Sequence, residues 1–246
     1  MRQALQVDVV SDVVCPWCYI GKRRLETALA TLRVRAPALD VAVRWQPFQL
    51  NPDLPRDGIS RRRYLEAKFG GAARAEEIYA RVTEAGVTVD IPFAFDAIAR
   101  QPNTLDAHRL IAWAQEPSSA VSNELAKTRG DAEAMVERLF RAYFLEGRFV
   151  GDRAELAALA ADTGYDAVKA RAFLESDALA ETVARADERA RESGISGVPF
   201  FIFNGKIAVS GAQQPEVLHD AIVQARTRTQ PPASGDAASD RVIPGN

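Results

Sequence analysis

The chain has 246 residues, of which 47% are hydrophobic and 26% charged, and its formal net charge is -2. This is the composition of a globular protein that is long enough to bury a core without disulfide bonds. The small net charge and the lack of a long apolar run argue against nucleic acid or a membrane as a partner. The oligomeric state is left open.

The first fifty residues follow a strand–helix–strand pattern. Residues 5–14 are rich in valine and predict a buried strand, and Pro16 suits the first position of a following helix. That helix is expected to end before Pro37. Residues 41–45 predict a second strand, which Pro47 interrupts. The order predicts a parallel β–α–β unit.

Residues from about 52 to 191 predict helices instead. Asn103 is expected to cap one helix, with Asp106 three positions on as in a capping box. A second helix carries an apolar stripe from Val136 to Phe144, and a third starts after Asp152. The last helix of this block is predicted over about 177–194.

The end of the chain returns to β structure. Residues 200–203 and 206–209 flank Asn204 and Gly205, a strong signal for a two-residue hairpin, and a final helix is predicted over 215–226. We therefore predict an α/β protein: a thioredoxin fold with an inserted all-α helical domain. The thioredoxin-like domain comprises 1–52 plus 192–228, and 53–191 form the insertion, whose last helix packs back on the thioredoxin core. Residues 229–246, rich in Pro, Ser, Gly and Asp, are expected to be a disordered tail.

The only two cysteines, Cys15 and Cys18, form a C-x-x-C motif directly after the first predicted strand. At the start of a helix, this spacing predicts dithiol–disulfide chemistry, with Cys15 as attacking thiolate and Cys18 as resolving thiol. The N-terminal N–H groups and the helix dipole favour the thiolate. The alternative is a pair of inert buried thiols. A zinc site would need about four ligands, and only His108 and His219 remain, so no metal is expected.

Pro199 is the second informative position. A proline just before the apolar run that starts at Phe200 cannot donate to a β ladder, so it must lie at the start or edge of a strand. Sequence alone does not fix whether its peptide bond is cis.

Four separated segments, over roughly residues 5–227, resemble the FrnE-like branch of the DsbA family: 11–21, 47–52, 103–110 and 194–201. The resemblance implies a thioredoxin fold interrupted by a helical domain, and thiol–disulfide exchange with disulfide-containing client proteins. It also implies that a cis-Pro199 lies against the dithiol and that the backbone of Val198 contacts an extended substrate. No cofactor is implied; glutathione or a thioredoxin-type protein would serve as reductant.

Kappa-class glutathione transferases and 2-hydroxychromene-2-carboxylate isomerases resemble the chain in layout. They carry serine where this chain has Cys15, and the kappa class usually shows Gly-Ser-Asp-Arg where this chain has residues 210–213. A glutathione-dependent isomerase or transferase acting on a small aromatic compound, with glutathione as co-substrate, is the alternative function. A holdase that binds unfolded clients without redox chemistry is a third.

The residues around the motif have two interpretations each. Trp17 carries no charge that would hold the thiolate, so we expect the dithiol to be a mild oxidant suited to isomerase or reductase activity. Alternatively, Trp17 forms an apolar lip for unfolded substrate. Asp12 is typical of a turn or cap residue. Alternatively, it accepts a proton from Cys18 during resolution.

The resemblance places Asn103 and His108 at the substrate cleft, although a structural histidine is the alternative. Asn51 lies near the position that contacts glutathione in kappa-class relatives, or it is a turn residue before a proline. The run from Arg61 to Arg63 is expected to be solvated. The candidate substrate-binding residues are thus Pro16, Trp17, Asn51, Asn103, His108, Val198 and Pro199.

The first residues carry no signal-peptide pattern before the first strand, so we expect a cytoplasmic protein. Structural disulfides are rare in the cytoplasm, which favours a catalytic motif.

Overall fold

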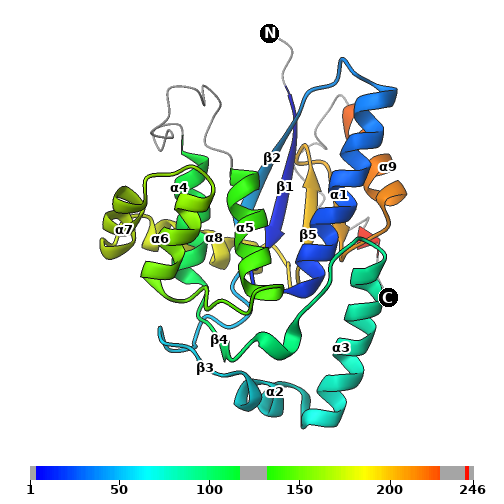
Figure 1. The fold of residues 1–246 in the computed structure, drawn as a ribbon. Helices are drawn as coiled ribbons and strands as arrows, with labels where there is room; N and C mark the ends of the chain where they lie inside the picture. The colour runs from blue at the N-terminus through cyan, green and yellow to red at the C-terminus, as the bar shows by residue number, and fades with distance from the viewer. Residues whose placement is uncertain (1–3, 117–131, 228–241, 244–246) are drawn as a thin grey trace.

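A five-stranded sheet forms the centre of the molecule in the computed structural model, which describes residues 4–116, 132–227 and 242–243 (Figure 1). The strand order is β2-β1-β5-β6-β7. The strands are β1 (Leu5–Ser11), β2 (Val41–Pro47), β5 (Phe200–Phe203), β6 (Ile207–Ser210) and β7 (Val242–Ile243).

The predicted β–α–β unit is confirmed. Strands β1 and β2 pair in parallel, from Leu5 opposite Val41 to Ser11 opposite Pro47, and helix α1 (Pro16–Arg35) connects them. Strand β1 ends at Ser11 rather than at residue 14, because the chain turns there and the N–H of Cys15 donates to the carbonyl of Asp12 at 3.0 Å. Strand β2 runs through to Pro47, which is tolerated because β2 is an edge strand of the sheet.

The predicted hairpin is present, but β6 begins at Ile207 rather than at residue 206, so three residues connect the two strands. Asn204 and Gly205 adopt φ of 55° and 65°, the two positive values that the tight turn between β5 and β6 requires. Strand β5 lies antiparallel to β1 as well. Strand β7 pairs in parallel with β6, so the expected disorder of 229–246 is wrong for Val242–Ile243. The rest of that prediction lies outside the described residues.

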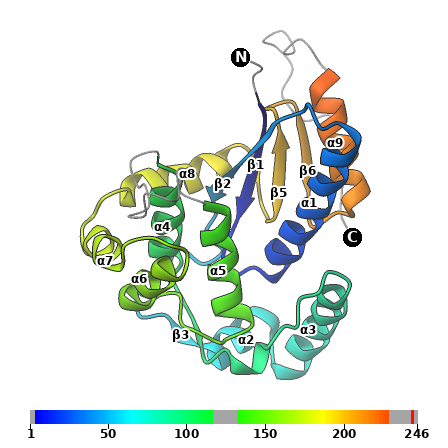
Figure 2. The same cartoon turned by 45° about the horizontal axis from the view of Figure 1, so that its top comes forward.

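Helices α1 and α9 (Pro215–Thr227) pack together on one side of the sheet, and helices of the segment between β2 and β5 lie on the other (Figures 1 and 2). The segment between β2 and β5 contains α2 (Arg61–Phe69), α3 (Ala72–Val87), α4 (Leu105–Gln115), α5 (Ala132–Phe144), α6 (Arg153–Asp162), α7 (Ala167–Glu175) and α8 (Ala180–Glu192). Helices α2 and α3 lie beyond the end of β1 at which α1 begins (Figure 1).

The inserted segment is not purely helical. It also contains a 3-10 turn (Phe95–Ala97) and a two-stranded ladder in which β3 (Ile59–Ser60) pairs with β4 (Arg100–Gln101). Helix α8 contacts β2, and the N–H of Gln49 donates to Asp187 of this helix at 2.8 Å.

Aromatic packing joins helix α1 of the thioredoxin-like part to helix α5 of the inserted segment. The rings of Tyr19 on α1 and Phe140 on α5 stack with centroids 4.9 Å apart. The Tyr19 hydroxyl donates to Glu137 at 2.9 Å, so its one polar group is also satisfied. The predicted fold class, a thioredoxin fold with a helical insertion, is confirmed.

Candidate active site

The C-x-x-C motif lies at the N-terminus of the 20-residue helix α1. Cys15 is the N-cap residue with an extended backbone (φ −94°, ψ 112°), and Pro16 takes the first helical position as predicted. Cys15 therefore lies at the positive end of the helix dipole, which stabilises a negative charge on its sulfur.

The Cys15 sulfur lies against the chain that leads into β5. Its thiol donates to the carbonyl of Val198, with 3.6 Å between sulfur and oxygen, and the Val198–Pro199 peptide bond is cis. The register of the sheet explains this meeting: Val10, near the end of β1, faces Phe200, the first residue of β5. The motif and the proline are therefore brought to the same end of two adjacent strands.

A glycine allows the helix to approach this proline closely. A Cβ at Gly21 would stand 3.0 Å from Cγ of Pro199 and 3.1 Å from Cζ of Phe201. The glycine thus fixes how near the first turns of α1 can lie to the strand.

Cys18 is buried beneath Cys15. Its side chain is 1% exposed, and both cysteines are free thiols. Burial raises the pKa of Cys18 well above its usual value, and the adjacent Cys15 sulfur raises it further. The Ser11 side chain and the Asp12 backbone act in the opposite direction. At neutral pH Cys18 therefore remains a protonated thiol.

Trp17 is the exposed side chain of the motif, at 38% exposure, whereas Cys15 is only 5% exposed. An apolar ring thus lies at the surface next to a recessed sulfur. A disulfide that reaches Cys15 must come close to this ring.

Asp12 and His108 lie together inside the protein. Asp12 is completely buried, does not cap α1, and one of its carboxylate oxygens accepts the N–H of Leu50 at 2.7 Å. The other oxygen lies 3.3 Å from Nε2 of His108, which is 4% exposed. Asp12 therefore does not cap α1, but it is a turn residue as predicted, because its carbonyl accepts the N–H of Cys15 at 3.0 Å. His108 is buried, as Cys15 is.

The two asparagines make loop and helix contacts. The amide of Asn103 donates to the carbonyls of Pro52 and Leu54 at 3.0 and 2.9 Å, and its oxygen accepts the N–H of Leu105. Thr104, not Asn103, is the N-cap residue of α4. The amide of Asn51 donates to the Tyr64 hydroxyl at 3.5 Å. None of these hydrogen bonds involves Cys15 or Cys18.

Arg61 is a residue of this region that the sequence pattern missed. It is 8% exposed, and its guanidinium donates to the hydroxyls of Tyr79 and Tyr143 at 2.6 and 3.1 Å and to the amide of Gln101. The predicted solvated face is therefore wrong for Arg61, while Arg62 is exposed as expected. Three consecutive arginines do not by themselves indicate which of them will be buried.

No group of three or more His, Cys, Asp or Glu side chains that could hold a metal occurs in the described ranges. Within the same ranges, no helix is long and apolar enough to cross a membrane.

A dithiol at a helix N-terminus, placed against a cis-proline at the start of an inner strand of a mixed sheet, defines the class of thioredoxin-fold thiol–disulfide proteins. The model of the DSBA-like thioredoxin domain matches residues 6–223. The chain belongs to this family, and the predicted resemblance to DsbA-type proteins is confirmed.

Individual relatives agree with the family. The probable DsbA oxidoreductase SCO1869 from Streptomyces coelicolor is 32% identical, with a TM-score of 0.76 over 98% of this chain and 100% of its own. The uncharacterized protein YwbO of Bacillus subtilis is 26% identical over 219 residues, which are 89% of this chain and 96% of YwbO. The cytosolic disulfide reductase DsbM from Pseudomonas aeruginosa shares the fold, with 18% identity and a TM-score of 0.53 over 80% and 83% of the two chains.

Proposed function

We propose that this protein is a dithiol–disulfide oxidoreductase and isomerase that acts on disulfides of client proteins. Cys15 is the nucleophile and Cys18 the resolving thiol. The observation that carries the proposal is the place of the Cys15 sulfur, at a helix N-terminus and 3.6 Å from the carbonyl that precedes cis-Pro199. A client in extended conformation can pair with the backbone of Val198 while its disulfide meets Cys15.

Disulfide exchange has two steps, attack on the client and resolution of the mixed disulfide. The different surroundings of Cys15 and Cys18 suit them to the first and the second step, respectively. The Cys15 thiolate attacks one client sulfur, and the other client sulfur leaves as a thiolate, which gives a mixed disulfide. Cys18 keeps its proton before this step, because burial raises its pKa. Once deprotonated, Cys18 attacks the Cys15 sulfur and releases the second client thiol.

Trp17 supports a protein substrate. Its exposed ring lies beside a recessed sulfur and offers apolar contact to an unfolded segment. Because Trp17 brings no charge that would hold the thiolate, we propose that the protein reduces or rearranges disulfides rather than introducing them. Glutathione or a thioredoxin-type protein would regenerate the dithiol in the cytoplasm, where such reductants are abundant.

The test uses a small secreted protein with scrambled disulfides as client, incubated with reduced glutathione. The wild-type protein should speed the recovery of native client disulfides, and Cys15→Ser should abolish this effect. Cys18→Ser should accumulate a mixed disulfide with the client. An equal effect of the double-serine variant would instead indicate a holdase. Conjugation of glutathione to an aromatic electrophile, without disulfide exchange, would indicate the glutathione-dependent alternative.

A further inference from the structure

One arginine of helix α1 is buried without a negative charge beside it. Arg24 is 9% exposed, and its guanidinium donates to the carbonyl of Ala212. Its Nε is buried without a hydrogen-bond partner, and the described residues place no carboxylate within ion-pair distance of the guanidinium. Burial lowers the pKa of Arg24, and no neighbouring charge opposes this effect. A buried cation in this state is costly unless an anion joins it.

The two basic residues that precede Arg24 on α1 are paired with carboxylates. Arg23 lies 3.0 Å from Glu26 and 2.5 Å from Glu137. Lys22, which is 2% exposed, lies 3.0 Å from Glu137. Burial acts to lower the pKa of both groups, but their carboxylate partners outweigh it and raise both above their usual values. The missing anion is therefore specific to Arg24 and is not a general property of the helix.

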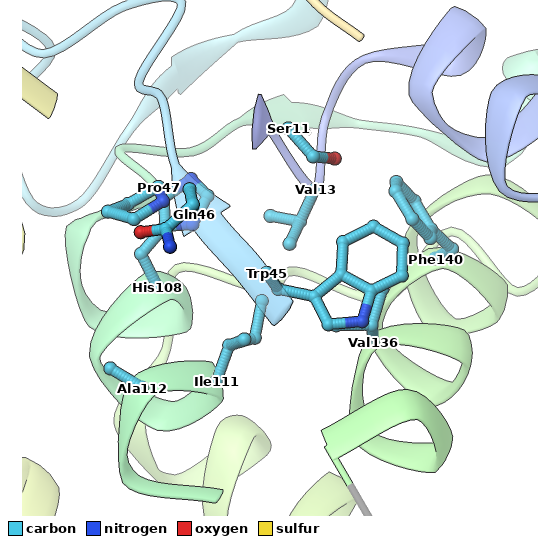
Figure 3. Close-up of a pocket in the computed structure, with 10 residues that line it drawn as sticks. All are labelled: Ser11, Val13, Trp45, Gln46, Pro47, His108, Ile111, Ala112, Val136 and Phe140. Atoms are coloured by element: carbon cyan, nitrogen blue, oxygen red, sulfur yellow. The ribbon is translucent and has the colours of Figure 1, made fainter. Parts of the chain in front are cut away.

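Arg24 lines a cavity between α1, α3 and α9. The cavity has a volume of about 630 Å³, which is within the range of small-molecule sites. Its wall comes from the middle of α1, from residues 88–90 after α3 and from residues 214–215 at the start of α9. Neither cysteine lines it, so the cavity is separate from the dithiol. By contrast, the cavity between the ends of β1 and β2 and helix α4 measures about 20 Å³ and has room for one water molecule (Figure 3).

The charges that line the larger cavity favour a ligand with a single negative charge. Arg23 and Glu26 pair with each other, whereas Arg24 has no anionic partner among the described residues. Asp90 also lines the cavity, and its negative charge would repel a second anionic group on the ligand. The N-terminus of the 13-residue helix α9 borders the cavity, and its dipole favours an anion as well.

The same cavity offers apolar contact to the uncharged part of a ligand. Ala30 of α1, Val89 after α3 and Pro215 of α9 all line it. We propose that this cavity binds a small monocarboxylate with an apolar body, and that Arg24 holds the carboxylate. The guanidinium donates to the carboxylate oxygens and its buried charge is thereby neutralised. This site does not depend on the function proposed above.

The experiment titrates the isotope-labelled protein with phenylacetate and follows the side-chain Nε–H signals of arginine by nuclear magnetic resonance. Phenylacetate carries one carboxylate on an apolar ring. Phenylacetamide has nearly the same shape without the charge, and inorganic phosphate tests for a general anion site. The variant Arg24→Met removes the guanidinium and assigns its signal. The matched control is Arg33→Met, because Arg33 is exposed on the same helix.

Phenylacetate should shift the Arg24 signal in a saturable manner, with a dissociation constant on the order of 1 mM, as expected for a ligand of about ten non-hydrogen atoms. Phenylacetamide should bind at least about 10-fold more weakly, because it lacks the charge that meets the guanidinium. In Arg24→Met, the backbone signals of residues 88–90 should report a similar loss of phenylacetate affinity. Arg33→Met should bind as the wild type does.

A second variant keeps the test decisive if Arg24→Met does not fold. Ala30→Trp fills the cavity from an exposed position of α1 and leaves Arg24 in place, so it should also weaken phenylacetate binding. Cys15→Ser should bind phenylacetate with wild-type affinity, and a loss in this variant would overturn a site separate from the dithiol.

Three other results would overturn the proposal. The first is no shift of the Arg24 signal by phenylacetate at concentrations well above 1 mM, roughly the affinity expected for its size. The second is equal affinity for phenylacetate and phenylacetamide, which would mean that the charge is not recognised. The third is tighter binding of inorganic phosphate than of phenylacetate, which would indicate a general anion site.

Discussion

Arg109 fixes helix α4, and its loss should strongly destabilise the fold. Its side chain is 1% exposed and donates to Asp106 at 2.6 Å. The other hydrogen bonds go to main-chain carbonyls at the end of α7 and in the turn that follows, namely Phe173, Leu174, Ser176 and Ala178. The last carbonyls of a helix have no partner within the helix, so the guanidinium supplies donors to this end of α7, in addition to the N–H and hydroxyl of Ser176.

The variant Arg109→Met keeps an apolar stem of similar length and removes the guanidinium. Loss of one partner of a buried ion pair costs about 3–5 kcal/mol, and each buried carbonyl left without a donor adds about 1 kcal/mol or more. Asp106 keeps Arg153 at 2.8 Å, and some carbonyls will gain water, which moderates the loss. We expect a decrease of about 4 kcal/mol in the free energy of unfolding, a large part of the total for a typical domain.

Urea denaturation monitored by circular dichroism measures this change. The matched control is Arg171→Met on α7, whose ion pair with Glu175 is half-exposed and should be worth about 0.5 kcal/mol or less. A loss below about 1 kcal/mol in Arg109→Met would show that the carbonyls of α7 do not depend on the guanidinium.

The ion pairs of Asp106 with Arg109 and Arg153 should make the stability of the protein depend on pH. Burial alone would raise the pKa of Asp106, but the hydrogen bonds and charges of Arg153 and Arg109 outweigh it and lower this pKa. A lowered folded-state pKa adds stability that is fully present above the unfolded value of about 3.9 and is lost as pH falls through the folded value. Asp106→Asn should therefore be less stable at neutral pH and should lose less stability on acidification than the wild type. A parallel acid dependence in the two proteins would contradict this assignment.

Two further predictions concern the region of the dithiol. In a Cys15→Ser background, Ser11→Ala should raise the pKa of Cys18 further, because the Ser11 side chain lowers it; the ultraviolet absorbance of the thiolate measures this, and an unchanged titration would contradict the contact. Arg61→Met should cost about 3 kcal/mol of stability, since it removes three buried hydrogen bonds of about 1 kcal/mol each. Arg62→Met should have little effect, because Arg62 is exposed; equal losses in the two variants would contradict the buried network.

Local patterns were sufficient for the thioredoxin-like part of the fold. The valine-rich strand, the proline at the helix start and the Asn204–Gly205 turn each act through neighbouring residues, and all three are in the structure. The motif that holds Cys15 and Cys18 was also visible, because a helix N-terminus is itself a local feature.

The surroundings of the dithiol could not be predicted in the same way. Asp12 and His108 meet because α4 of the insertion packs against β2, the neighbour of β1, a contact between distant segments that no local pattern encodes. Arg61 is buried because Tyr79 and Tyr143, from two other helices, converge on it. Asn103 was predicted to be a cap and instead joins α4 to the loop at residues 52–54.

The most direct test of the central claim is to locate the mixed disulfide formed with a peptide that contains a disulfide. We expect Cys18→Ser to accumulate a peptide adduct on Cys15, Cys15→Ser to form none, and the wild-type protein to pass through the adduct to an internal disulfide. An adduct on Cys18 in the Cys15→Ser protein, at the wild-type rate, would contradict the assigned roles of the two cysteines.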